Sequence, residues 1–367
     1  MIDTDEDLAA IIRAGGYQRD FVCDVIVDDE RVLEGVSLTR CELKSNGNAK
    51  IRTQGTALFA YSDELGRSVV PEDMTSWLTP YATYLDVFYQ VSLNGFVARI
   101  LQGHLKVVKV TDPQETRVRA GGRRVTVGSQ VQLSLADAFA VTDKERFIAP
   151  SSPSSLESVW EEIGNLTNLA VLRNVDDAPI PRSITYQESR LDAVHDLGAV
   201  LDGIPYVNPD GDVTLQPNTW GAETEELRMG ADGTIVSADP DTLTDEGIYN
   251  QVVVRSHEDD QTAILAKVEL ETGPLRYGGP FGRVPYFASS RYVTDPTQAV
   301  AYATSLLPVV SSQPAASYLI QCLPDPRREV GDVVPFERDG EELVGRIVER
   351  TLGSSGPMTL RVMVDRG

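Results

Sequence analysis

Histidine has the most versatile side-chain chemistry in this sequence, and only three histidines occur. His104 falls in an expected strand, His195 in an expected helix and His257 beside an expected turn. None has a second ligand at a metal-binding interval, such as four residues further along a helix. We therefore expect all three to be structural or to lie on the surface.

The cysteines are the next candidates for chemistry. Cys23, Cys41 and Cys322 are too few and too widely spaced for a disulfide framework or a zinc site. A bridge between Cys23 and Cys41 is one alternative, and buried reduced thiols are the interpretation that we favour. The sequence therefore predicts no metal and no cofactor.

Acidic clusters offer a third kind of site. Residues 238–247 contain Asp239, Asp241, Asp245 and Glu246, but an EF-hand loop beginning at Asp239 fails because Leu243 occupies its fifth position. A glycosidase needs two carboxylates roughly 5–10 Å apart, and with 55 acidic residues such a pair would arise by chance. The sequence has no Gly-x-Ser-x-Gly elbow, phosphate-binding loop or dinucleotide fingerprint. We therefore expect no catalytic residue and no enzyme.

The chain is strongly acidic, with 33 Lys and Arg against 55 Asp and Glu and a net charge of −22. This charge repels phosphate backbones and argues against specific nucleic-acid binding. It serves solubility, or it provides a surface to which DNA does not adhere. The start of the sequence, MIDTDEDLAA, lacks the basic residues of a secretory signal. No apolar run is long enough to span a bilayer, so we expect a soluble protein that is made in a cytoplasm without membrane insertion.

Residues 1–150 carry the pattern of short strands separated by tight turns. Asn46-Gly47 and Asn94-Gly95 are typical hairpin turns. The strand before the second turn alternates, with four apolar residues on one face: Val87, Tyr89, Val91 and Leu93. This pattern predicts a sandwich or barrel, which we interpret as a first β module.

Residues 151–230 are expected to form a small α+β domain after the Pro/Ser-rich stretch 149–157. Ser154 and Glu157 have the spacing of a capping box, and a helix with Trp160 on its apolar stripe should follow. A second helix is expected to begin at Ser189 and to end at Gly203 in a left-handed cap. Two short strands then flank the Asn-Pro-Asp-Gly turn at 208–211.

Residues 231–367 return to β structure with one helix. The segments 249–256 and 261–270 are expected to pair as strands. Asp295 should cap the helix, Pro296 should take its first position, and four residues should pack inward: Val300, Ala303, Leu306 and Leu307. The chain closes in a three-stranded meander over 328–364, whose last strand has its apolar face at Met358, Leu360, Val362 and Val364.

The first and last parts share a weak internal repeat. Asp86-Val87 begins a strand, Asn94-Gly95 turns it, and a second strand returns through Gly103. Asp332-Val333, Asp339-Gly340 and Gly345 follow the same plan in the meander. This echo predicts two β modules of similar design, separated by the α+β insert. The predicted fold class is thus mainly β with a smaller α+β part.

Several longer runs support a family resemblance. The run GGPFGRVPYFASSRYVTDPTQAVAYATSLLP (278–308), followed by PDPRREVGDVV (324–334), resembles minor tail proteins of siphophages that infect actinobacteria. The organisation, including the helix and strand–Asp-Gly–strand pattern of 155–217, is similar to the baseplate or tail-tip hub family of phage tails. The resemblance covers most of the chain from about residue 20, except for details of 111–150. Its motifs are structural, so no catalytic residue carries over.

The resemblance implies a structural virion protein at the distal end of a phage tail. The family pairs a β tube module, an α+β insert and a second tube module, and three chains then present six modules in a ring. The implied partners are two further copies in a homotrimer, a tail tube or distal tail protein above, and spike or receptor-binding proteins below. DNA would pass through the channel during ejection without specific binding.

Other functions stay open on the sequence alone. The hub of a contractile injection machine would share the architecture. A tail-tip hydrolase of cell-wall polymer would need a cleft with two poised carboxylates or a His/Cys pair. A carbohydrate-binding receptor protein would use an aromatic platform, for which Trp77, Trp160 and Trp220 are the tryptophans available, although Trp160 is expected in the core.

Overall fold

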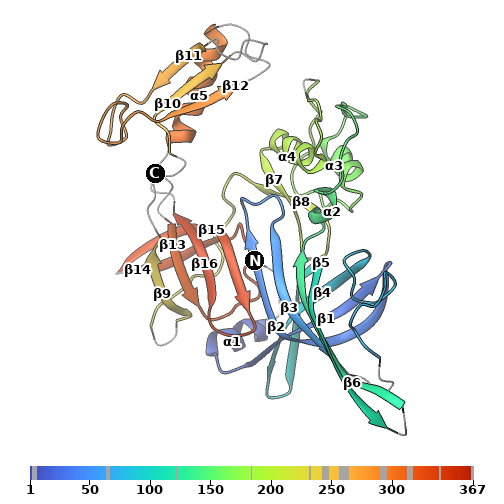
Figure 1. Cartoon of the computed structure of the whole chain (residues 1–367). Helices are drawn as coiled ribbons and strands as arrows, with labels where there is room; N and C mark the ends of the chain where they lie inside the picture. Colours follow the sequence, from blue (N-terminus) through green and yellow to red (C-terminus); the bar gives the residue numbers. More distant parts are fainter. Residues whose placement is uncertain are drawn as a thin grey trace. The chain divides into compact units, whose positions relative to one another are not determined.

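A computed structural model describes residues 1, 6–62, 67–120, 123–182, 184–230, 233–241, 248–255, 264–289, 296–311, 317–338 and 340–364. The chain forms two compact units. Unit 1 comprises Met1–Asp239 and Tyr318–Met363, and unit 2 comprises Pro240–Ser317 and Val364–Gly367. Strands dominate unit 1, and unit 2 combines a three-stranded sheet with one helix (Figure 1). The described chain is mainly β, which confirms the prediction. Within the described ranges, no helix has the length and apolar character needed to cross a membrane.

Unit 1 begins with helix α1 (Glu6–Ala14) and a six-stranded closed sheet. The strands are β1 (Gln18–Val27), β2 (Glu30–Asn46), β3 (Thr53–Tyr61), β4 (Thr83–Leu93), β5 (Phe96–Ala120) and β6 (Arg123–Ala136). They pair in the order β1-β4-β5-β6-β3-β2, and β2 pairs again with β1. Because the first and last strands pair, this β module is a barrel without an open edge between them. We call it the first module.

Local sequence explains the hairpins of the first module. Asn94 and Gly95 adopt φ of 49° and 90°, as a type I′ turn requires, and they join β4 to β5. Along β4 buried and partly exposed residues alternate, so Val87, Tyr89 and Val91 face the barrel core. The predicted turn is confirmed, and so is the apolar face at Val87, Tyr89 and Val91, whereas Leu93 at the end of the strand is only partly buried.

A second module of unit 1 uses strands from the end of the chain. It contains β9 (Ile235–Pro240), β13 (Ser317–Cys322), β14 (Val333–Arg338), β15 (Glu341–Gly353) and β16 (Met358–Val364). Segment 223–228 adds a further extended stretch, which bridges β14 at Glu223 and Leu227. The N–H of Ile235 then donates to the carbonyl of Arg228, so this segment also contacts the start of β9. We call these elements the second module.

The two modules share one strand order. The first module reads β4-β5-β6-β3-β2 and the second reads β14-β15-β16-β13-β9. We leave out β1 and segment 223–228 and number the five remaining strands of each module 1 to 5 in the order in which they occur along the chain. In that numbering, neighbouring strands in both modules follow the order 3-4-5-2-1. The hairpins β4–β5 and β14–β15, which the sequence pairs as a repeat, occupy the same places. One difference remains, because β1 is antiparallel to β4 whereas segment 223–228 is parallel to β14.

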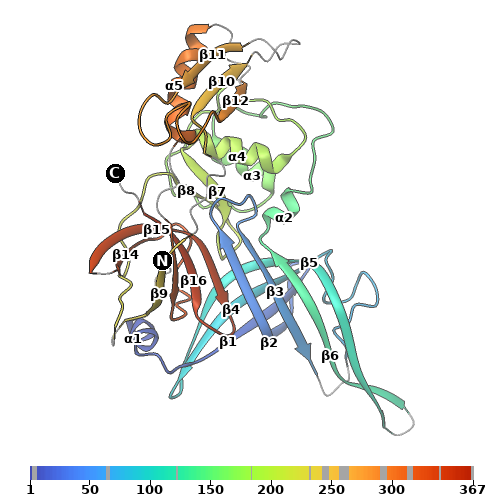
Figure 2. The ribbon, with the colours of Figure 1, turned by 60° about the vertical axis from the view of Figure 1, so that its left-hand side comes forward.

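Between the modules the chain forms an α+β insert (Figure 2) with α2 (Phe139–Thr142), α3 (Val159–Thr167), α4 (Arg190–Val200), β7 (Gly203–Val207) and β8 (Val213–Pro217). Its core is continuous and includes the fully buried Trp160. The indole N–H of Trp160 donates to the carbonyl of Val175 at 3.1 Å. The prediction that Trp160 is a core residue is therefore confirmed.

Helix ends in the insert were predicted in part. Ser189 caps α4 as predicted and accepts from the N–H of Asp192 at 3.1 Å. The capping box at Ser154 is wrong, because Ser158 caps α3 and accepts from the N–H of Glu161 at 3.0 Å. Ser158 and Glu161 repeat the Ser-x-x-Glu spacing one turn later, next to the apolar stripe.

The predicted glycine cap of α4 is also wrong. Asp202, with φ of 52°, takes the left-handed position, and Gly203 begins β7 instead. A Cβ at Gly203 would lie 3.0 Å from the carbonyl oxygen of Gln216. The glycine is therefore needed for the close approach of β7 to β8 rather than for a positive φ.

Unit 2 contains β10 (Gln251–Arg255), β11 (Ile264–Glu269), β12 (Pro285–Ser289) and α5 (Pro296–Ser311). The strand order is β11-β10-β12, and β10 and β11 pair antiparallel as predicted. Pro296 begins α5 as predicted, while the expected cap Asp295 lies outside the described residues. Val300 does not pack inward, because it is 48% exposed and Ala299 takes the buried position. Ala299 and Ala303 are four residues apart on one helix face, from which Val300 is rotated by about 100°.

Candidate functional site

His104 connects the insert to the first module. Its ring nitrogen Nδ1 lies 2.6 Å from Oδ1 of Asp86 on the neighbouring strand, and its ring stacks on Tyr84 with centroids 4.6 Å apart. Its backbone N–H donates to the carbonyl of Pro209 at 2.8 Å. These contacts hold the turn between β7 and β8 against β5. No group of three potential metal ligands surrounds it or any other described position.

The other predicted positions are dispersed. His195 lies in α4 against Phe139, and burial lowers its pKa. His257, Asp245 and Glu246 lie outside the described residues, and Asp239 belongs to β9. Within the described part of the chain, the candidates for chemistry therefore do not converge on one cleft.

The cysteines behave as buried thiols. All three are free and buried, in agreement with the interpretation that we favoured over a bridge: Cys23, Cys41 and Cys322. Burial raises the pKa of the Cys41 and Cys322 thiols to about 12 and also raises that of Cys23. Such thiols are neutral at physiological pH and are poor nucleophiles.

The most unusual side chains of unit 1 are five arginines with no more than 7% of their surface exposed. We call this group the arginine junction: Arg52, Arg327, Arg328, Arg346 and Arg350. They come from the start of β3, from the loop before β14 and from β15. Burial of an unpaired cation is strongly unfavourable, so their partners define what the junction does.

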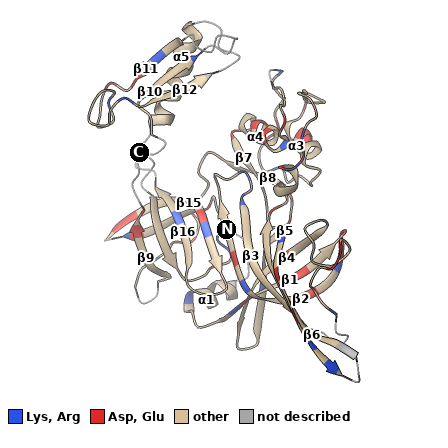
Figure 3. Ribbon diagram, viewed as in Figure 1, with Lys and Arg blue, Asp and Glu red and all other residues tan. Residues whose placement is uncertain are grey.

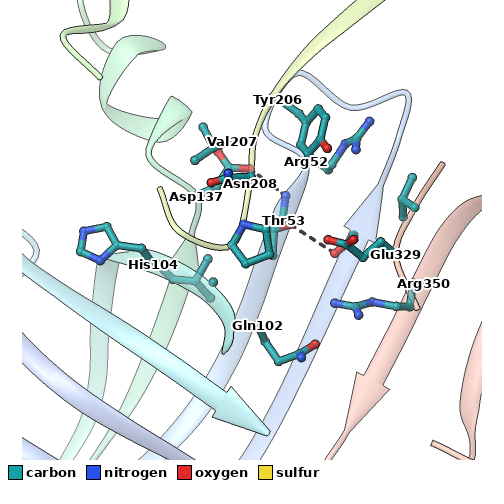
Figure 4. Close-up of a pocket in the computed structure, with 15 residues that line it drawn as sticks. Arg52, Thr53, Gln102, His104, Asp137, Tyr206, Val207, Asn208, Glu329 and Arg350 are labelled. Carbon is teal, nitrogen blue, oxygen red and sulfur yellow. Dashed lines mark hydrogen bonds between the residues drawn. The ribbon is translucent and has the colours of Figure 1, made fainter. Parts of the chain in front are cut away.

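Arg52 joins the first module to the insert. Its guanidinium carbon lies 3.8 Å from the centre of the Tyr206 ring on β7, and its Nη2 donates to Oε1 of Gln216 on β8. Burial lowers the pKa of Arg52 to about 10, so the side chain keeps its charge at neutral pH. Figure 4 shows Arg52 and Tyr206 side by side at one wall of a small cavity.

Asp137, which directly follows β6, is a buried acidic residue influenced by the charge of Arg52. Its carboxylate accepts from the backbone N–H of Thr53 at 2.8 Å and from that of Phe139 at 3.1 Å. Burial raises its pKa to about 6, although these two hydrogen bonds and the charge of Arg52 act in the opposite direction. The carboxylate thus fixes the chain where β6 leaves the barrel and enters α2.

Arg346 and Arg350 of β15 donate to backbone carbonyls. Arg346 contacts the oxygens of Pro217 at 2.6 Å and Asn218 at 3.1 Å, which fixes the end of the insert on the second module. Arg350 donates to the carbonyl of Arg328 at 2.5 Å. Burial lowers the pKa of both arginines. Their role is to satisfy loop carbonyls that would otherwise be buried without partners.

The loop before β14 contains a bidentate ion pair. Arg327 contacts both oxygens of Asp325, at 2.9 and 2.7 Å, and its Nη2 also lies 2.9 Å from Oε2 of Glu225. Glu225 belongs to segment 223–228, so the pair connects that segment to the loop. Bidentate geometry of this kind gives both strength and orientation.

The cavity beside the arginine junction is small. Its volume is about 40 Å³, and its wall includes Arg52, Asp137, Tyr206, Glu329 and Arg350 (Figure 4). This volume accommodates a few water molecules, whereas sites for small-molecule ligands measure roughly 300–1,000 Å³. The arrangement is suited to holding three structural parts together and offers no room for a substrate.

The two modules also meet directly. Residues Glu42–Asn46 of β2 pair antiparallel with Glu349–Gly353 of β15, a contact that we call the module seam. Leu43 and Leu352 are opposite each other in it, and both are fully buried. Gly55 on β3 permits the packing, because a Cβ there would lie 2.5 Å from the side chain of Leu43. The seam makes one continuous sheet from the two modules.

The arginine junction was not predicted from the sequence. Arg346 and Arg350 are four residues apart in a strand and therefore point to the same side, which was a usable signal of a polar face. Arg327 and Arg328 lie in the run 324–334 that carries part of the family resemblance. The partners of these arginines are distant in sequence, so their pairing was not predictable.

Comparison with known proteins supports a fold assignment. No protein-family model matches the sequence, and a search of curated proteins gives no match. The chain is similar in structure to the tail protein from Neisseria meningitidis MC58, with a TM-score of 0.58 and 12% identity over 95% of this chain and 97% of the other.

Two further solved structures are similar. The 43 kDa tail protein of prophage MuSo2 from Shewanella oneidensis gives a TM-score of 0.54 at 11% identity, over 94% of this chain and 98% of the other. A chain of the Francisella PdpA–VgrG complex gives 0.55 at 10% identity, over 95% of this chain and 59% of the other. Nearly the whole chain therefore shares its fold with the Neisseria tail protein and the prophage MuSo2 tail protein.

Proposed function

We propose that this protein is a structural component of a phage tail tip or baseplate, where it acts as the hub at the distal end of the tail tube. The observation that carries the proposal is the pair of β modules with one strand order, 3-4-5-2-1, joined edge to edge at the module seam. The fold likeness to two phage tail proteins supports it. In this proposal, the first tube module lies within residues 1–150 and the insert within 151–230, together with α2. The second module lies within 231–367, together with segment 223–228.

The repeated module suggests how the hub assembles. Phage tail tubes are expected to be stacks of hexameric rings, as the family resemblance implies. Three chains with two modules each present six similar modules, which match such a ring above and leave three-fold symmetry below. A homotrimer is thus the oligomer that we propose, and the channel on its axis is the route for DNA.

The charge of the chain fits passage of DNA. The net charge is −22, and Figure 3 shows acidic and basic residues distributed over both modules, with basic residues at the free end of the β5–β6 hairpin. A negative channel wall would repel the DNA phosphates and prevent adhesion. We therefore propose an acidic lumen, and no specific nucleic-acid site.

The neighbours follow from the same position. We propose a tail tube or distal tail protein above the ring and spike or receptor-binding proteins below, with the protein located in the virion after assembly in the host cytoplasm. The resemblance of residues 278–308 and 324–334 to minor tail proteins points to a siphophage of actinobacteria. We also propose that the chain is not an enzyme, since the cavity beside the arginine junction is too small for a substrate.

A second candidate is the hub of a contractile injection machine. The structural likeness to a chain of the PdpA–VgrG complex favours it. The gene neighbourhood separates the two, because a phage hub is expected among tail and capsid genes and an injection machine among sheath genes without capsid genes.

Light scattering of the purified chain tests the hub proposal. A mass of three chains, reached as the concentration rises, is the expected result, because a hub subunit should be completed by its copies. A stable monomer at high concentration would contradict it. Incubation with purified cell wall provides a parallel test, in which release of soluble fragments would favour a hydrolase instead.

A further inference from the structure

The module seam is a template for a contact that a single chain leaves incomplete. Within the chain, strand 1 of the first module (β2) pairs with strand 4 of the second module (β15). Since both modules have the same strand order, a second contact of the same type would join strand 1 of the second module (β9) to strand 4 of the first (β5). In the described structure β9 and β5 do not pair with each other.

β9 has one edge available for such a contact. It is the last strand of the eleven-stranded sheet and pairs on its other side with β13. Its first residue, Ile235, is occupied by the hydrogen bond to Arg228. Val236 is 63% exposed and Asp239 is also exposed, whereas Ala238 between them is buried. A strand edge with an exposed β-branched residue is a ready site for pairing.

β5 has the matching edge. Its pairing with β4 ends at Lys106, whereas the strand itself continues to Ala120 against β6. In β15, pairing with β14 ends at Arg346 and pairing with β2 begins three residues later, at Glu349. Counting three residues on from Lys106 in β5 gives Lys109, which is exposed. The stretch Lys109–Thr111 is therefore the equivalent of the part of β15 that forms the seam.

A groove adjoins this stretch of β5. It has a volume of about 490 Å³ and is lined by residues of the 71–81 loop and of β5, among them Met74, Tyr81, Val110 and Pro113. Met74 and Tyr81 are 73% and 62% exposed, which is high for large apolar side chains. Strand addition gains its affinity from main-chain hydrogen bonds and its specificity from pockets that accept alternate side chains. This groove provides such a pocket beside the free edge.

We propose that the edge of β9 in one chain pairs antiparallel with Lys109–Thr111 of β5 in a second copy of this chain. The inference deepens the proposed hub function and rests on it. The Lys109 ammonium of one chain and the Asp239 carboxylate of the other then lie on paired strands, where opposite charges attract. The occupant is a second copy because the seam inside the chain already supplies the geometry of this contact.

The contact determines the symmetry of the assembly. Two different edges meet, so the interface is heterologous, and each chain uses β9 toward one neighbour and β5 toward the other. Each intermolecular contact repeats the intramolecular module seam. A ring of alternating modules then closes after three chains when successive modules are related by about 60°, as six equal modules require.

Engineered disulfides test the contact with the full chain. Two single variants, Val236→Cys and Lys109→Cys, are mixed and oxidised, and the products are separated without reductant. The native cysteines are buried and stay in place. We expect a covalent dimer only in the mixture. A double variant with both cysteines should give a covalent trimer, whose mass is that of three chains.

The matched control places the second cysteine elsewhere on β5. Val97 is 58% exposed and lies on the part of β5 that pairs with β4, so Val236→Cys mixed with Val97→Cys should give no dimer. A dimer of Val236→Cys alone would show an isologous β9–β9 contact and would overturn the inference. Trimers by light scattering without cross-linking would overturn the inference and leave the hub function standing, whereas a chain that stays monomeric in assembled tails would overturn both.

Discussion

Truncation of Leu352 at the module seam should destabilise unit 1 strongly. Leu352 is fully buried and lies opposite Leu43, which is also fully buried, so the pair connects β15 to β2. Leu352→Ala removes three carbon groups, worth about 2.4 kcal/mol at roughly 0.8 kcal/mol each. The cavity left behind increases the loss, and buried Leu→Ala changes span about 2.7–5 kcal/mol. We therefore expect a loss of about 3–4 kcal/mol.

Urea unfolding followed by far-UV circular dichroism measures this loss. The midpoint should fall while the slope with denaturant stays the same, because the native surface is little changed. Val97→Ala is the matched control, since Val97 is 58% exposed and lies outside the seam and surface changes usually stay within about 0.5 kcal/mol. A double-mutant cycle with Leu43→Ala should give a coupling of at least about 0.5 kcal/mol, as expected for residues in contact.

A loss below about 1 kcal/mol for Leu352→Ala would refute this reasoning. It would mean that the seam is loosely packed and that the two modules are joined by the chain rather than by a shared sheet. The proposal of six equivalent modules in a ring would then lose its structural template.

Three further predictions concern the same unit. Gly55→Ala should destabilise unit 1 by about 1–3 kcal/mol, because the new Cβ would lie 2.8 Å from a backbone oxygen of β2. Gly128→Ala is the control, because nothing lies within 4 Å of a Cβ at that position. Equal unfolding midpoints for the two variants would contradict the packing. Burial raises the pKa of Asp137 from its ordinary 3.8 to about 6, so the folded chain keeps this carboxyl protonated at a pH where the unfolded chain ionises it. The stability that this proton contributes to the folded chain is lost as pH rises from 4 through 6. Relative to Asp137→Asn, the wild type should lose on the order of 3 kcal/mol from pH 4 to pH 7, and parallel pH profiles in urea titrations would be the opposing result. The three buried thiols should react with a thiol reagent only after unfolding, and rapid labelling of the native chain would contradict their burial.

Local signals in the sequence predicted local structure well. The Asn94-Gly95 turn and the Ser189 cap were predictable because their residues satisfy a backbone requirement within a few positions. Val300 was misplaced because it is adjacent to Ala299, and both are apolar, so the pattern did not show which of the two is buried. Ser154 was misplaced for a similar reason, because a second capping pattern follows it.

Long-range pairing was beyond the sequence. β2 and β15 are about 300 residues apart, and no turn or periodicity connects them, so the module seam and the strand order emerged only from the structure. The arginine junction was hidden for the same reason. Its cations are ordinary surface residues by type, and their carbonyl partners at Pro217 and Arg328 are identifiable only in three dimensions.

The central claim is that this chain forms a hub of six equivalent modules at the end of a tail tube. Cryo-electron microscopy of the assembled particle tests it most directly. We predict three copies in a ring coaxial with the tube, with β9 of each chain beside β5 of the next. A single copy on the outside of the particle, or a ring in which these strands face away from each other, would contradict the account.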